Sequence, residues 1–103
     1  MKLHPSIQAY FDADGAAPLD AFAPDAIVAD EGHRHIGHAA IDAWWRDVTA
    51  KYQAVAEPLE VSTKDGAHEV RARVTGRFPG SPIKLTFAFR MKDDRIAALE
   101  IGS

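Results

Sequence analysis

The stretch that decides the fold reads GRFPGSPIKLTFAFRMKDDRIAAL and spans residues 76–99. Its middle alternates polar side chains with apolar ones at Leu85, Phe87, Phe89 and Met91. A period of two residues is typical of a β-strand that is buried on one face. Turns are indicated on either side, by Pro-Gly-Ser-Pro at 79–82 and by the Asp-Asp pair at 93–94. The stretch therefore predicts a strand whose neighbours run in the opposite direction.

The same alternation extends through the second half of the chain. It recurs over residues 55–63, 69–78 and 96–101, with short turns between the runs. Four consecutive strands joined by short turns predict an antiparallel meander. One face of such a sheet is apolar and needs a cover.

The first half of the chain has the period of helices instead. Apolar residues recur every three or four positions over 3–11 and 41–52, and residues 18–22 add a short helical turn. Residues 25–30 predict one short strand. We therefore expect an α+β fold, in which about three N-terminal helices cover a four-strand meander with one short additional strand.

Length and composition describe a single globular domain over residues 1–103. Hydrophobic residues make up 47% of the chain and charged residues 26%, which excludes the disordered and low-complexity classes. The chain has no cysteine, so disulfides, zinc knuckles, iron–sulfur clusters and thiol catalysis are excluded together. We expect no metal and no cofactor.

Charge and hydropathy exclude two further classes of partner. The net charge is −3, and neither half of the chain is a basic patch of the kind that neutralises phosphates, so we expect no nucleic acid partner. No apolar run approaches the length that spans a bilayer, and the first residues lack the apolar centre of a signal peptide. We expect a cytoplasmic protein that does not bind membranes.

Asp30 is the most informative single residue. It shares a face of its predicted strand with Val28, so it points inward if Val28 does. A carboxylate among apolar side chains loses hydration, which raises its pKa toward that of a useful general base. The structural alternative is a carboxylate that accepts backbone N–H bonds and fixes the turn at Gly32.

Three histidines follow in the segment 33–38. His33 and His35 have the spacing that puts both rings on one face of a strand, which zinc and iron sites use. No distant Asp, Glu or His is aimed at them, so ordinary surface-turn histidines or an Asp30–His35 pair are the favoured interpretations.

Apolar residues and cations divide between the two faces of the predicted sheet. The expected interior residues, which are either plain core or ligand contacts, are Trp44, Trp45, Phe78, Phe87, Phe89 and Leu99. The cations expected on the opposite face are Arg71, Arg73, Arg77, Lys84, Arg90 and Lys92. That face predicts a solvated or dimer-contacting surface, with an anion site as the alternative.

The order of elements and three local segments resemble one superfamily. The segments are FAPDAIVADEG at 22–32, GHAAIDAWW at 37–45 and the stretch at 76–99. Together they resemble the nuclear transport factor 2-like superfamily, which includes ketosteroid isomerases, scytalone dehydratase and SnoaL-like polyketide cyclases. The resemblance implies a cone-shaped curved sheet around a pocket that is open at one end. It also implies a homodimer through the outer face of the sheet.

The resemblance also assigns roles to individual residues. Asp30 matches the catalytic base of the ketosteroid isomerases and Tyr10 matches their oxyanion-hole tyrosine. The position of their second oxyanion donor is Phe87 here, so one donor of that mechanism is missing. Asp30 with His35 resembles the His and Asp pair of scytalone dehydratase. The Asp-Arg-Asp set of the epoxide hydrolases has no match.

Two hypotheses about function follow. In the first, the domain binds a small apolar molecule and performs cofactor-free acid–base chemistry of the isomerase, cyclase or dehydratase type. Asp30 is then the base and Tyr10 or His35 its hydrogen-bond partner. In the second, the domain is a non-catalytic binding or dimerisation module, with no cavity between Tyr10, Asp30 and Phe87. Because the chain is short for the superfamily, we expect any pocket to be small or partly closed.

Overall fold

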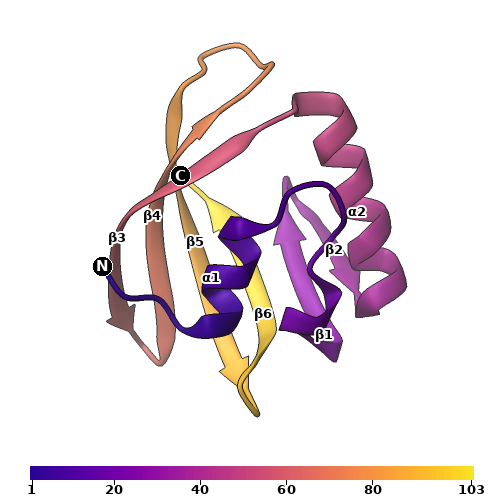
Figure 1. Cartoon of the computed structure of the whole chain (residues 1–103), viewed down its shortest axis with the longest axis vertical. Coiled ribbons are helices and arrows are strands. Elements are labelled where there is room, and N and C mark those ends of the chain that lie inside the picture. The colour runs from indigo at the N-terminus through magenta and orange to yellow at the C-terminus, as the bar shows by residue number, and fades with distance from the viewer.

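The computed structural model describes residues 1–103 and shows two helices against one sheet (Figure 1). The helices are α1 (Pro5–Asp12) and α2 (Gly37–Tyr52), with a single 3-10 turn, η1 (Leu19–Ala21), between them. The strands are β1 (Phe22–Asp30), β2 (His33–Ile36), β3 (Val55–Lys64), β4 (Ala67–Thr75), β5 (Ile83–Lys92) and β6 (Arg95–Gly102). The fold is α+β as expected, but with two helices and one short turn in place of about three helices.

The sheet has six strands in the order β2-β1-β6-β5-β4-β3. Strands β3 to β6 pair with their chain neighbours in antiparallel fashion, whereas β1 pairs in parallel with β6. The sheet is therefore mixed, and the expectation of an antiparallel sheet with one short extra strand was wrong in this respect. The parallel pair is possible because α2 and β3 to β5 separate β1 from β6 in the chain, which is ample for a crossover.

Strands β1 and β2 form a tight hairpin that was not expected. Its two-residue loop consists of Glu31, with φ of 51°, and Gly32, with φ of 79°. Two successive residues with positive φ give the turn whose twist matches that of a β-hairpin. The loop leaves Asp30 as the last residue of β1, opposite His33 of β2.

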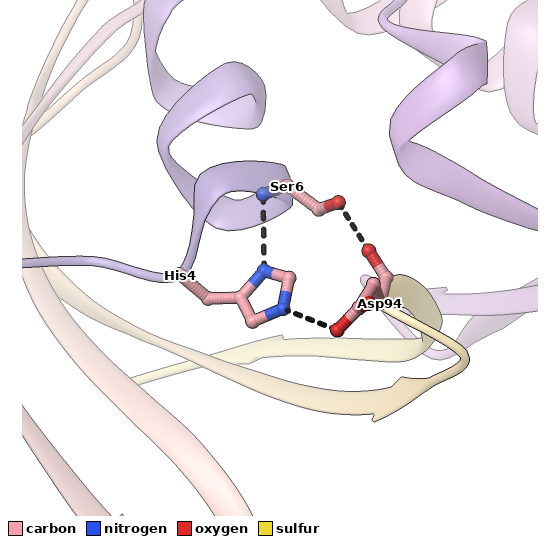
Figure 2. A network of polar contacts seen from close by, with 3 residues as sticks. All are labelled: His4, Ser6 and Asp94. Carbon is pink, nitrogen blue, oxygen red and sulfur yellow. Dashed lines mark hydrogen bonds and ion pairs between the residues drawn. The ribbon is translucent and has the colours of Figure 1, made fainter.

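A network of polar side chains fixes the start of α1 (Figure 2). His4 Nδ1 accepts a hydrogen bond of 3.1 Å from the Ser6 backbone N–H, and so caps the helix. Ser6 Oγ donates to the Asp94 carbonyl at 2.7 Å, and His4 Nε2 lies 3.6 Å from Asp94 Oδ1. These contacts tie the start of α1 to the turn between β5 and β6.

The core lies between the two helices and the inner face of the sheet. Helix α1 contributes Ile7 and Tyr10, and α2 contributes Ile41 and Trp44. No buried residue is polar or charged apart from the polar tips of the tyrosine and tryptophan side chains. Neither α-helix has the length and apolar character needed to cross a membrane.

Candidate functional site: a cavity with a carboxylate in its wall

A cavity of about 800 Å³ opens between the two helices and strands β3 to β6. Sixteen of its 23 lining residues are hydrophobic. Tyr10, Asp30 and Phe87 all line it, so the filled core of the second hypothesis is absent. Its volume falls within the range of small-molecule sites and is larger than the short chain led us to expect.

Asp30 brings a carboxylate into the wall of this cavity. Strand β1 ends at Asp30, and Trp44 of α2 donates its indole N–H to Asp30 Oδ2 over 3.0 Å. Burial raises the pKa of Asp30 above its ordinary value. The Trp44 hydrogen bond acts in the opposite direction, because it stabilises the charged form, and the neighbouring charge of Glu31 raises the pKa further.

Tyr10 lies in the cavity wall with its ring packed among other aromatic rings. Its centroid lies 5.6 Å from that of Trp45 and 6.0 Å from that of Phe87. The hydroxyl forms no hydrogen bond within the protein, and it is not sealed off, because every fully enclosed polar side-chain atom has a partner. Burial, and then the charge of Asp30, raise the pKa of Tyr10 well above its ordinary value. The hydroxyl therefore stays protonated and can donate to a ligand.

His35 does not line the cavity, so it does not contact a ligand there as Tyr10 can. It pairs with Val28 across the β1–β2 hairpin, and its ring centroid lies 6.0 Å from that of Trp44. Its charge lowers the pKa of Asp30, but no hydrogen bond joins the two side chains. His35 therefore acts on the carboxylate at most through the electric field, and the expected Asp30–His35 hydrogen-bonded pair does not form.

The histidines of segment 33–38 point to different partners. The ring of His38 hydrogen-bonds to the Phe22 carbonyl over 2.9 Å. His33 is exposed at the hairpin. Nowhere in the structure do three or more His, Asp or Glu side chains gather in a way that would hold a metal ion.

The expected interior residues divide into two groups. Trp44, Trp45, Phe78 and Phe87 line the cavity. Phe89 and Leu99 do not line it, because both are enclosed in the core. Phe87 and Phe89 follow the same two-residue period along β5, so periodicity alone does not separate a cavity residue from a core residue there.

Sequence reasoning missed a polar contact among the lining residues. The Tyr52 hydroxyl, at the end of α2, donates to Glu31 Oε1 over 2.8 Å. Both residues line the cavity, together with Phe11 and Val48. Tyr52 was visible on the apolar stripe of α2, but the contact depends on the hairpin turn that lifts Glu31 toward the helix.

Comparison with known proteins places this geometry in a family. A family model described as a SnoaL-like domain matches residues 6–99. No curated protein matches the chain. A solved structure from Sinorhizobium meliloti, provisionally named a polyketide cyclase, is 50% identical with a TM-score of 0.90, and the match covers 96% of this chain and 94% of that chain.

More distant structures show the same fold. A Catenulispora acidiphila protein with a ketosteroid isomerase-like fold, solved in complex with trimethylamine, has a TM-score of 0.82 at 17% identity and covers 99% of this chain and 87% of its own. An NTF2-like protein from Anabaena variabilis has a TM-score of 0.76 at 19% identity. The match covers 97% of this chain and 86% of that chain. Likeness at this level of identity extends to the fold alone.

Proposed function

This chain belongs to the family of SnoaL-like domains, and from that premise we propose that its cavity binds a small, mainly apolar molecule from which Asp30 takes a proton. The observation that carries the proposal is a half-buried carboxylate in the wall of a mainly apolar cavity. A carboxylate with a raised pKa is a stronger base than one in water. The reaction belongs to the isomerase, cyclase or dehydratase type and needs no cofactor.

Tyr10 supplies the partner for the charge that develops on the substrate. As the proton leaves a carbon beside a carbonyl, negative charge moves to the carbonyl oxygen, where a phenol hydroxyl stabilises it. Phe87 has no donor to add, so the proposed site has one oxyanion donor instead of two. The loss of one such donor costs about 3–4 kcal/mol of transition-state stabilisation. The proposed chemistry is therefore directed at substrates that are more acidic than simple ketones.

The competing function is binding without chemistry. It shares the cavity but gives Asp30 only a structural role, as the acceptor of the Trp44 indole N–H. The two functions differ in whether Asp30 changes its protonation state while the ligand is bound.

The test uses 5-nitrobenzisoxazole, a flat apolar probe that reports proton removal. A base takes the proton from C3, the C–H electron pair completes the nitrile, and the N–O bond breaks to leave a coloured phenolate. We expect the wild-type protein to accelerate this reaction above the buffer rate. We expect Asp30→Asn to lose about 100-fold of that acceleration, because a positioned general base contributes roughly 10²–10⁴.

Asp25→Asn is the matched control, because it removes the same charge from an exposed position of β1 outside the cavity. It should keep the wild-type rate. Equal rates for Asp30→Asn and wild type would overturn the role of Asp30. Binding of the probe without acceleration would favour the non-catalytic function.

We also propose that two copies pair through the outer face of the sheet. On this face Glu57 lies beside Arg73, with 3.0 Å between Oε1 and Nη1, and Arg71 Nη1 donates to Thr86 Oγ1 over 2.9 Å. Acidic and basic side chains on the same face can meet their opposites in a second copy related by a two-fold axis.

A further inference from the structure

We propose that the ligand of this cavity carries a positive charge, as an ammonium or similar cationic group on an apolar body; the inference rests on the proposed function and specifies its ligand class. It is carried by the charge and the aromatic content of the cavity wall.

The ionisable groups that line the cavity are predominantly acidic. Its carboxylates are Asp14, Asp30 and Glu31, and no Lys, Arg or His lines it. The whole chain carries 12 Lys and Arg against 15 Asp and Glu, so the cavity wall is more one-sided in charge than the chain as a whole. Asp14 and Glu31 are exposed to solvent and Asp30 is half-buried, so together they attract cations to the cavity, with the charge of Asp30 screened least by water.

Aromatic rings form much of the remaining wall. The seven that line the cavity are Tyr10, Phe11, Trp44, Trp45, Tyr52, Phe78 and Phe87. Several meet edge to face, among them Tyr10 with Trp45 at 84° and Tyr52 with Phe78 at 89°. Edge-to-face packing sets the edge of one ring against the face of its neighbour, so the rings of this wall are turned in different directions. A cationic group that lies over the face of a Trp, Tyr or Phe ring is attracted to it, and this wall offers seven such rings.

One ring in this set already attracts a cation of the protein itself. The Lys51 ammonium lies 5.0 Å from the ring centroid of Tyr52. The Tyr52 hydroxyl donates to Glu31, which places negative charge at the edge of the ring. Lys51 is outside the lining set.

A neutral ligand would displace water from the Asp30 carboxylate without supplying a positive charge to balance it. Filling the cavity displaces water from Asp30, whose hydrogen-bond donors in the protein are both neutral: the Trp44 indole and the Glu31 backbone N–H. The charge of His35 acts on it without a hydrogen bond. Burying a carboxylate without a compensating charge is costly. A cationic ligand supplies that charge, and the unpartnered Tyr10 hydroxyl offers a further oxygen in the same cavity wall.

The experiment compares two probes of the same shape that differ in charge: 3-hydroxyphenyltrimethylammonium and 3-tert-butylphenol. The chain has two tryptophans, Trp44 and Trp45, whose indole N–H groups donate to Asp30 and to the Gly15 carbonyl at the cavity wall. Titrations followed by their two indole ¹H–¹⁵N resonances therefore report binding in this cavity. We expect the cationic probe to bind about tenfold more tightly, from cation–π and carboxylate attraction together.

Asp30→Asn and Glu31→Gln should each reduce this preference at least about threefold, because each removes one negative charge from the wall. Asp25→Asn should leave it unchanged. Equal or tighter binding of the neutral probe would overturn the inference while leaving apolar binding intact. If neither probe shifts an indole resonance while 5-nitrobenzisoxazole is still consumed, the inference alone fails.

Discussion

Asp30 is the residue at which stability and function oppose each other. Its carboxylate is half-buried beside apolar rings, and the Trp44 indole is the one side chain that hydrogen-bonds to it. Burial stabilises the protonated form, so the native state holds this proton more tightly than the unfolded chain does. A general base in this position therefore comes at some cost in the free energy of folding.

The raised pKa of Asp30 makes the free energy of unfolding depend on pH, and this dependence can be tested. Because the pKa of Asp30 is raised in the native state, stability is fully present below its ordinary value of 3.8 and falls as pH rises toward the native pKa. Asp30→Asn removes this pH-dependent contribution to stability, and its side-chain oxygen can still accept the Trp44 hydrogen bond. We expect the variant to gain stability relative to wild type across that window, as measured by urea unfolding at a series of pH values. Parallel curves for the two proteins would contradict it, and Asp25→Asn serves as the control.

Only part of the arrangement around Asp30 can be predicted from the sequence. The shared parity of Val28 and Asp30 along β1 correctly indicates a partly buried carboxylate near the core. The orientation of His35 is not available from parity, because it depends on where α2 places the Trp44 ring. The Tyr52–Glu31 contact likewise depends on a turn with two positive φ values.

At the scale of elements, the end of β4 packs so closely against the end of α2 that Gly76 has no room for a side chain. A Cβ at Gly76 would lie 2.8 Å from the Tyr52 carbonyl oxygen and 3.0 Å from Ala54 Cα. Both contacts are with backbone, so neither can yield by a side-chain rotation. We expect Gly76→Ala to lower the free energy of unfolding by about 1–3 kcal/mol.

Gly102 is the matched control for this substitution. A Cβ there would meet nothing within 4 Å; Gly102 is the last residue of β6, and Gly76 directly follows β4. Gly102→Ala should therefore stay within about 0.5 kcal/mol of wild type or stabilise the strand slightly. If the two substitutions change the free energy of unfolding equally in chemical denaturation, the close backbone contacts at Gly76 are not the cause of its effect.

The elements themselves were largely predictable, and their pairing only in part. The period of two residues located β3 to β6, and the helical period located α1 and α2. Strand β2 has four residues, of which two are histidines, so it carries no apolar alternation to read. The parallel contact of β1 with β6 joins opposite ends of the chain, and local periodicity holds no information about such contacts.

At the scale of the whole molecule, the helices cover one face of the sheet and leave the other open (Figure 1). If two copies pair through that open face, sedimentation velocity should give twice the 11.2 kDa mass of the chain. Arg73→Glu places like charges beside Glu57 and should shift the equilibrium toward single chains. A wild-type protein that sediments as a single chain at every concentration would contradict the proposed pairing.

Helix α1 has a consequence for how the cavity behaves in time. Eight residues are too few to hold a helix without tertiary support, and this one is fastened at its start through Ser6 and Asp94. We therefore expect the wall that bears Tyr10 to open by local unfolding more readily than the central strand β5. Its amide hydrogens should exchange with solvent faster than those of β5. A ligand that bridges Tyr10 and Asp30 would slow that exchange first, so occupancy can be read there before any substrate is known.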